Sequence, residues 1–189
     1  IQATTISPFP STLSSVPSTL SSGKFPEKRA MDRAIYPGSF DPITLGHLNI
    51  IERALDMYDG LIVLLAVNPG KNSLFTVEEN LEMVREVTSQ WPQVEVDTTT
   101  GLLVDYARKH GIRQAVRGLR AVTDFDAEFS MALTNRSMWE DFDTVYLMTS
   151  AEYMFLRSST VKQIAEHGGD VSRFVPPVVE ARMRARFGY

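Results

Sequence analysis

The stretch that decides the fold of this chain is Tyr36-Pro37-Gly38-Ser39-Phe40-Asp41-Pro42-Ile43-Thr44-Leu45-Gly46-His47. A mostly apolar run at 33–36 leads into it, and the Pro-Gly pair is typical of a turn, so we expect a buried strand to end there. Apolar residues recur at helical spacing after Thr44, which predicts a helix start. This order presents backbone N–H groups and the positive end of a helix dipole, which favour a phosphate ligand. His47 lies in the first helical turn, where its ring can face the same anion.

Strands and helices alternate after this stretch. The run 61–67 is apolar throughout, which is typical of a strand buried on both faces of a parallel sheet. One helix fits between it and the first strand, which makes a β-α-β unit. We expect further helices at 76–90 and 101–110 and from 123, 158 and 176, and further strands at 94–97, 114–116 and 144–148. The pattern therefore predicts an α/β domain around a parallel sheet.

Composition sets the broad class of protein. The 189 residues are 43% hydrophobic and carry a net charge of −4, which allows one sizeable core and does not support a nucleic-acid partner. Cysteine is absent and the three histidines are far apart in sequence, so we expect no disulfide and no metal-binding residues. No apolar run reaches the ~18–20 residues that a membrane-spanning helix needs, so no membrane partner is expected.

The first thirty residues differ from the rest of the chain. Seven Ser, four Thr and four Pro make up half of this segment. Such a composition buries too little apolar surface to offset chain entropy, which predicts a disordered leader at 1–30 and a single domain at 31–189. A vector-derived leader, a mis-assigned upstream start and a transit peptide would all fit, and we favour the first two because the segment has few Arg.

Two segments beyond the opening stretch carry candidate phosphate ligands. Lys71 follows the second strand, and ligands bind beyond the carboxyl ends of parallel strands. A short strand is followed by Arg117-Gly118-Leu119-Arg120, whose two guanidinium groups could each form a bidentate contact with a phosphate. Taken alone, Lys71 is most simply a solvated turn residue, and the tetrapeptide an ordinary basic loop.

Two later helices add further candidates. The helix from 123 has acidic residues in its first turn, and Glu128 follows them closely. Acidic residues are expected at a helix start because they complement the positive end of the helix dipole, so they need no functional explanation. Its apolar face is predicted to belong to the core and consists of Phe125, Phe129, Ala132 and Leu133. The run Ser158-Ser159-Thr160 predicts a helix cap, and its hydroxyl groups could also donate to a triphosphate.

Four blocks of the sequence resemble the phosphopantetheine adenylyltransferases, nucleotidyltransferases whose first helix starts with His/Thr-x-Gly-His. The blocks occur in order between 31 and 189 and are the opening stretch, Asn68-Pro69-Gly70-Lys71, the run from Arg117 to Glu128, and the Ser-rich helix start. The last block departs from the family pattern Ser-Ser-Ser/Thr-x-x-Lys/Arg. With Lys162 in register, Arg157 replaces the first Ser, so it either adds a cation near the triphosphate or crowds the site.

The resemblance implies a Rossmann-like, doubly wound parallel sheet. It also implies transfer of the AMP part of ATP to 4′-phosphopantetheine, with Mg²⁺, giving dephospho-CoA and pyrophosphate in the penultimate step of coenzyme A biosynthesis. The expected partners are ATP, 4′-phosphopantetheine and dephospho-CoA or CoA. A cytoplasmic homohexamer is expected on the same ground.

Roles for individual residues follow from the resemblance. His47 is implied to be the catalytic residue and to stabilise charge on the α-phosphate in the transition state. Lys71 and Arg117 are implied to hold the acceptor phosphate. Leu103 would contact the pantetheine arm, and Ser39 would lie near both substrates. The residues implied to contact ATP are Ser39, Phe40, His47, Gly118, Leu119, Arg120, Glu128, Tyr153, Met154, Phe155, Leu156, Arg157, Ser158 and Ser159.

Other functions compete with this one. A relative in the same superfamily could use a nicotinamide or glycerol phosphate acceptor, although the Arg117–Arg120 block argues against it. A non-catalytic nucleotide or CoA sensor could keep the fold, and Arg157 is the feature that supports it. A fragment of a class I tRNA synthetase shares the first signature, but the chain is short for an anticodon domain and too acidic to favour RNA.

Overall fold

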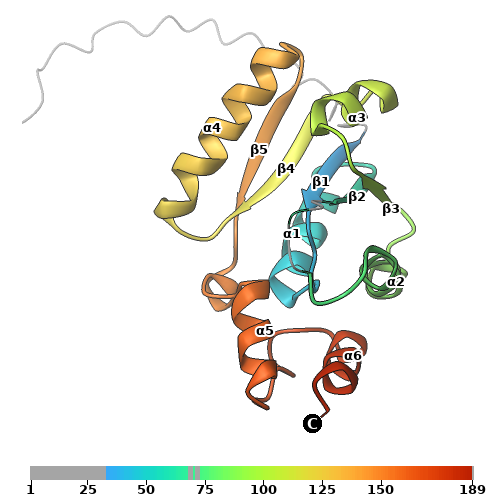
Figure 1. Ribbon diagram of the computed structural model, residues 1–189. Coiled ribbons are helices and arrows are strands. Elements are labelled where there is room, and N and C mark those ends of the chain that lie inside the picture. The colour runs from blue at the N-terminus through green and yellow to red at the C-terminus, as the bar shows by residue number, and fades with distance from the viewer. Residues whose placement is uncertain (1–32, 68–69, 71–72, 189) are drawn as a thin grey trace, which may run out of the picture.

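The computed structural model describes residues 33–67, 70 and 73–188, in which five parallel strands form one sheet (Figure 1). The strands are β1 (Ala34–Gly38), β2 (Leu61–Ala66), β3 (Val94–Thr99), β4 (Gln114–Leu119) and β5 (Asp143–Met148). The helices are α1 (Leu45–Leu55), α2 (Val77–Thr88), α3 (Leu103–His110), α4 (Val122–Met138), α5 (Ser158–Glu166) and α6 (Pro177–Phe187), with a 3₁₀ turn η1 (Ala151–Tyr153). The predicted α/β class is confirmed. The leader predicted at 1–30 lies outside the described residues.

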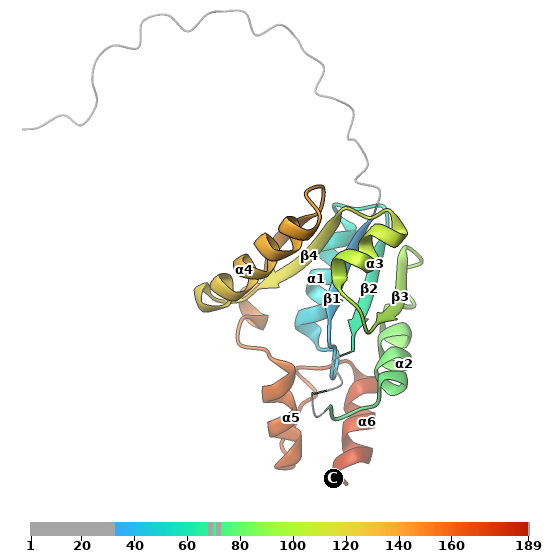
Figure 2. The same ribbon diagram turned by 45° about the horizontal axis from the view of Figure 1, so that its top comes forward.

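The strand order is β3-β2-β1-β4-β5, which makes the sheet doubly wound as expected. The chain moves from β1 outward to β3, then returns to the other side of β1 for β4 and β5. The connections that leave β1 and β4 therefore run in opposite directions, which opens a crevice at the carboxyl ends of these two strands. Figure 1 shows α5 and α6 beyond that end of the sheet, and Figure 2 shows the same from a second angle.

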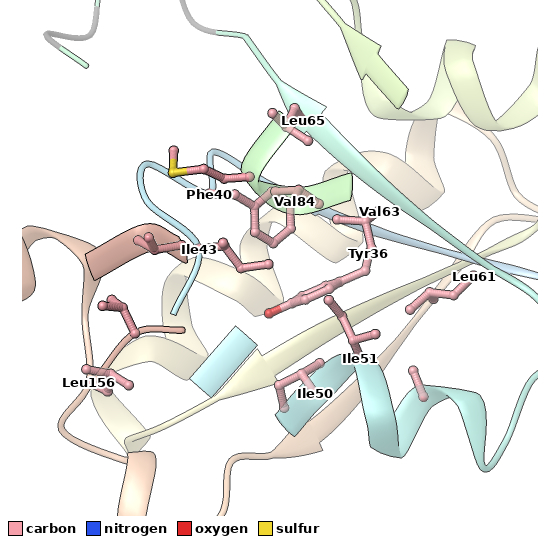
Figure 3. Close-up of a cluster of buried hydrophobic side chains, with 14 of the residues drawn as sticks. Tyr36, Phe40, Ile43, Ile50, Ile51, Leu61, Val63, Leu65, Val84 and Leu156 are labelled. Atoms are coloured by element: carbon pink, nitrogen blue, oxygen red, sulfur yellow. The ribbon is translucent and has the colours of Figure 1, made fainter. Parts of the chain in front are cut away.

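The central strands are buried on both faces because their side chains alternate between two hydrophobic clusters. Tyr36 and Val63 belong to the larger cluster, which includes side chains of α1, α2 and α6 (Figure 3). Ile35 and Leu64 belong to the smaller cluster, which α3 covers. This two-sided burial explains why β2 has no polar positions. None of the helices in the described part of the chain is long and apolar enough to cross a membrane.

Two strands extend further than their sequence predicts. β1 continues through Pro37 to Gly38, and β4 continues to Leu119, so Arg117 lies inside a strand and not beyond its end. Proline is tolerated in β1 because this strand pairs with β4 only near Ile35, so no ladder hydrogen bond is needed from position 37 on that side.

The prediction that the apolar face of α4 belongs to the core is wrong for the single chain. Phe125, Phe129 and Leu133 are 42%, 46% and 54% exposed. The rings of Phe125 and Phe129 stack on each other with their centroids 5.4 Å apart. Figure 2 shows α4 at the margin of the molecule. Helical spacing identified the apolar stripe correctly but could not tell whether this chain or another one covers it.

A buried carboxylate joins three segments around the signature turn. Asp41 is 5% exposed and accepts hydrogen bonds from the backbone N–H groups of Leu74 (3.0 Å) and Phe75 (3.0 Å). Lys162 of α5 donates to Oδ2 of the same carboxylate at 2.7 Å. Asn80 of α2 adds a longer contact at 3.4 Å. One side chain therefore fixes the turn after β1, the segment before α2 and the first turns of α5.

We expect Asp41→Asn to lower the free energy of unfolding by about 1–3 kcal/mol, because Lys162 loses its charged partner. Burial alone would raise the pKa of Asp41, but the bonds from Lys162, Leu74 and Phe75 outweigh it and hold the pKa below its ordinary value. This stabilisation is therefore present above the unfolded-state pKa near 4 and is lost as the pH falls through the lower folded-state pKa.

Urea denaturation at pH 7 and at pH 3 measures both effects. A matched control is Asp141→Asn, which removes an exposed pair with Arg113 at 3.7 Å and should cost less than about 0.5 kcal/mol. Equal midpoints for the two variants at pH 7 would contradict the role given to Asp41.

Candidate functional site

A cavity of about 360 Å³ opens at the carboxyl ends of β1 and β4, where the doubly wound sheet changes direction. The turn after β1, the first turns of α1, the end of β4 and the segment before α5 all contribute to its wall. Its lining residues are Tyr36, Pro37, Gly38, Ser39, Phe40, Thr44, Gly46, His47, Ile50, Arg117, Gly118, Arg120, Glu128, Thr149, Tyr153, Leu156, Arg157 and Ser158.

The floor of this cavity is a backbone turn held by aromatic packing. Phe40 has a φ of 44°, in the left-handed region that bulky residues rarely adopt, yet its ring is only 1% exposed. The ring packs edge-on against Tyr36 and His47, with centroids 5.3 and 5.1 Å away. A Cβ atom on Gly38 would lie 2.9 Å from this ring, so only glycine fits there. Burial of Phe40 thus stabilises a strained turn that lines the site.

The hydrogen bonds of His47 decide which ring nitrogen carries the proton. The backbone N–H of Thr44 donates to Nδ1 at 3.0 Å, and the Thr44 hydroxyl lies at the same distance. Because a backbone N–H can only donate, Nδ1 must be the unprotonated nitrogen of the neutral ring. Nε2 then carries the hydrogen. Histidine at this third helical position also caps α1, in the way that Glu does in a capping box.

The surroundings keep this ring neutral. Burial lowers the pKa of His47 most, and the charges of Arg120 and Arg117 lower it further, to about 4. At neutral pH the ring is therefore an uncharged hydrogen-bond donor through Nε2. It can stabilise negative charge on a ligand without first accepting a proton.

Arg117 is held in place by two partners. Its Nε donates to Glu128 Oε2 at 2.8 Å, and one Nη forms a second, short contact with the same carboxylate. The other Nη donates to the carbonyl oxygen of Pro37 at 2.6 Å. The Tyr146 hydroxyl donates to the backbone carbonyl of Glu128 at 2.8 Å, which ties α4 to β5. The guanidinium therefore has a defined orientation before any ligand arrives.

Arg120 approaches the cavity from the segment after β4. Its Nε lies 3.2 Å from Asp124 Oδ2, and one Nη donates to the carbonyl oxygen of Leu156 at 3.3 Å. Burial raises the pKa of Tyr36, against the opposing effect of Arg117 and Arg120, so its phenol stays protonated. Apart from Glu128, whose carboxylate is paired with Arg117, the walls offer cations and neutral donors, which is the set that binds phosphate groups.

A second cavity of about 490 Å³ adjoins the first. The two share Ser39, Arg120, Arg157 and Ser158 as lining residues. The second cavity adds Asp41, Ser73, Ser159 and Lys162. Among the described residues no group of three His, Asp or Glu side chains is arranged to hold a metal ion.

Most of the predicted site residues that the structure describes meet in the first cavity, and five of them do not. Leu119 is buried in β4 and Leu103 packs against the smaller core cluster, so neither lines this cavity. Met154 and Phe155 are 44% and 63% exposed. Ser159 lines the second cavity instead. Lys71 lies outside the described residues.

The prediction missed several residues that the fold brings to the site. Tyr36 and Ile50 line the cavity although their apolar setting predicts only a core role. Thr149 follows β5 and reaches the site because β5 pairs with β4. Asp124 is one of the first-turn acids that helix-dipole reasons alone would explain, and the fold pairs it with Arg120 and Arg157 at the cavity. The position of Thr149 just after a strand was the one signal that could have pointed to it.

We expect the His47 ring of the ligand-free protein to titrate with a midpoint near pH 4, because burial and two arginines oppose its protonation. Proton NMR of the ring hydrogens can follow it readily, since the chain has only three histidines. The resonance that is missing from the spectrum of the His47→Gln variant is assigned to His47. A midpoint at or above pH 6 would show that the ring is charged more easily than this geometry implies.

Comparison with known proteins places this site in a family. A model of the cytidylyltransferase-like family matches residues 35–164. A solved structure described as a nicotinate-nucleotide adenylyltransferase, from Vibrio parahaemolyticus, superposes with a TM-score of 0.62 at 17% identity and covers 80% of this chain and 97% of its own. That likeness supports the Rossmann-like fold.

Sequence similarity is more specific than this structural likeness. A phosphopantetheine adenylyltransferase of Heliobacterium modesticaldum is 50% identical over 158 residues, which are 84% of this chain and 94% of that protein. One of Carboxydothermus hydrogenoformans is 50% identical over 154 residues, which are 82% of this chain and 95% of that protein. With the signature turn, the arginine block and the Ser-rich helix start gathered around one cavity, the chain belongs to the phosphopantetheine adenylyltransferase family.

Proposed function

We propose that this chain transfers the adenylyl group of ATP to 4′-phosphopantetheine and releases dephospho-CoA and pyrophosphate. The observation that carries the proposal is the juxtaposition of a neutral His47 donor with Arg117 and Arg120 in one cavity at the switch point of the sheet. Family membership favours this enzyme over a non-catalytic nucleotide or CoA sensor.

The proposed reaction needs no strong base. A phosphate oxygen of 4′-phosphopantetheine attacks the α-phosphorus of ATP, and the bond from that phosphorus to the bridging oxygen breaks as pyrophosphate leaves. The attacking oxygen is already ionised at neutral pH, so catalysis rests on positioning and on stabilising charge.

His47 would donate from Nε2 to an oxygen of the α-phosphate as charge shifts in the transition state. Arg117 would hold the acceptor phosphate, with Lys71 as a second cation and Ser39 close to both substrates. Leu103 would contact the pantetheine arm. The residues proposed to bind ATP are Phe40, His47, Gly118, Leu119, Arg120, Glu128, the segment 153–157, Ser158 and Ser159.

Mg²⁺ belongs to this proposal as the ion that arrives with ATP. The described residues offer cations and hydroxyl groups at the cavity and no cluster of acids, which suits an ion carried by the phosphates. The ion would neutralise charge on the leaving pyrophosphate. A cytoplasmic location is part of the proposal because ATP and 4′-phosphopantetheine are its substrates.

The test is pyrophosphate release from MgATP with and without 4′-phosphopantetheine. We expect release to depend on the acceptor, with dephospho-CoA as the product. His47→Ala should lower turnover by about 10²–10³ because one charge-stabilising donor is lost. His110→Ala, which removes an exposed ring stacked on Tyr106, is the matched control and should leave turnover unchanged. Acceptor-independent release, or near-normal turnover of His47→Ala, would overturn the assignment.

We extend the proposal to a homohexamer, supported by the uncovered apolar stripe of α4. Phe125, Phe129 and Leu133 form an apolar stripe that the single chain leaves exposed, and contacts between copies would bury it.

Phe129→Glu should shift the assembly to smaller species, because burying a carboxylate in an apolar interface is costly. Multi-angle light scattering at micromolar concentration measures the mass. Ala127→Glu, a change at an exposed position on the opposite side of α4, is the control and should leave the mass unchanged. A hexamer that survives Phe129→Glu would exclude this stripe from the interface.

A further inference from the structure

Tyr36 of β1 is a buried residue whose side chain borders the first cavity. It is 6% exposed and belongs to the larger hydrophobic cluster, yet it also lines the cavity. Figure 3 shows its hydroxyl oxygen pointing away from Leu61 and toward the side on which Leu156 lies. Because Leu156 lines the same cavity, the hydroxyl end of the ring faces the cavity and not the interior of the core.

The hydroxyl group of Tyr36 has no hydrogen-bond partner among the residues that the structure describes. Two other tyrosines do have one. Tyr106 donates to Asp97 Oδ2 at 2.6 Å, and the Tyr146 hydroxyl donates to the backbone of Glu128. An unpaired hydroxyl group at a buried position costs free energy, so folded proteins nearly always pair it. The stability of the fold therefore does not explain the hydroxyl group of Tyr36, which is available to a ligand.

Aromatic packing fixes the direction of this hydroxyl group. The ring of Phe40 packs edge-on against that of Tyr36, with centroids 5.3 Å apart. The centroid of the His47 ring lies 6.4 Å from that of Tyr36, with an angle of 52° between the ring planes. The phenol is thus placed beside the imidazole before a ligand binds. Donors that are fixed in this way stabilise a transition state without first having to reorient.

The charges around Tyr36 favour an anionic ligand. Burial raises the pKa of Tyr36 most, against the guanidinium groups of Arg117 and Arg120, which lower it. The phenol therefore stays protonated and can donate one hydrogen bond. Both guanidinium groups line the first cavity, so they attract an anion into the space that the phenol faces.

Strand alternation places Tyr36 on the side of the sheet where we propose that the nucleotide binds. In β4, Val116 belongs to the larger cluster, as Tyr36 does. Alternation then puts Gly118 on the same side and Arg117 on the other one. A Cβ atom on Gly118 would lie 3.0 Å from Ile50 of α1, which agrees with this assignment. Gly118 is a proposed ATP-binding residue, and Arg117 is proposed to hold the acceptor phosphate. The phenol therefore faces the nucleotide, close to where the two substrates would meet.

We propose that the Tyr36 hydroxyl donates a hydrogen bond to an oxygen of the nucleotide α-phosphate, as a second neutral donor beside Nε2 of His47. This inference rests on the proposed adenylyl transfer, in which the acceptor oxygen bonds to the α-phosphorus while the bond to pyrophosphate breaks. Tyr36 keeps its proton throughout and stabilises the charge that shifts onto the α-phosphate oxygens. It is thereby a catalytic residue of this reaction.

Three Tyr→Phe variants, each lacking one oxygen, test this role. Tyr36→Phe should lower turnover about tenfold, as the loss of one hydrogen bond does, without lowering the melting temperature, because the hydroxyl group has no partner in the ligand-free fold. Tyr58→Phe is the matched control. Its hydroxyl group is also buried without a partner but lies away from the cavity, so turnover should stay unchanged. Tyr146→Phe loses a bonded hydroxyl group and should lower the melting temperature.

Isothermal titration of the full chain with AMP and with adenosine adds a readout that does not depend on turnover. Tyr36→Phe should weaken AMP binding about fivefold and change adenosine binding less than twofold, because only AMP carries the phosphate. Unchanged turnover and AMP affinity would overturn the proposal, as would equal losses for AMP and adenosine. If the wild-type chain shows no acceptor-dependent turnover while the AMP-specific loss persists, the proposed function fails and the phosphate contact of Tyr36 stands.

Discussion

The hydrogen-bonded carboxylate of Asp41 is the contact on which the geometry of the site depends. It joins the signature turn to the backbone of Leu74 and Phe75 and to Lys162 of α5. These segments come from three regions of the chain, and each borders the cavities. Because the carboxylate is almost fully buried, its bonds compete little with water. The strained turn at Phe40 and the start of α5 are thereby held together before a ligand binds.

Electrostatics at the site follows from this arrangement. Arg117 and Arg120 are oriented by acids of α4, and their charges keep His47 neutral. A neutral imidazole with its proton on Nε2 suits a reaction in which the nucleophile is already an anion and only charge must be stabilised. The strand order explains why these groups meet. β1 and β4 are neighbours although about eighty residues separate them, so the signature turn and the arginine block face one crevice.

Much of the fold and of the site was predictable from residue order. The continuous apolar run of β2 indicated a strand buried on both faces, and Thr76 caps α2 at the predicted helix start. Ser158 begins α5, but the prediction of a hydroxyl cap is wrong, because Arg157 is the N-cap and the Ser158 hydroxyl donates to the carbonyl oxygen of Pro42. Pro37 and Arg117 were expected to lie outside strands because local rules take no account of where a neighbouring strand stops pairing. The stripe on α4 was assigned to the core because helical spacing reports that a face is apolar and not what covers it.

The sequence by itself determined the class of fold, the family and the segments that line the cavity, because these depend on local patterns of apolar, turn-forming and charged residues. Only the tertiary structure decided which groups act together. The tautomer of His47 depends on one backbone N–H, and the environments of Arg157 and Lys162 depend on carboxylates far away in the chain. Hydrogen-bond geometry and burial arise from packing between distant segments, and no local pattern specifies them.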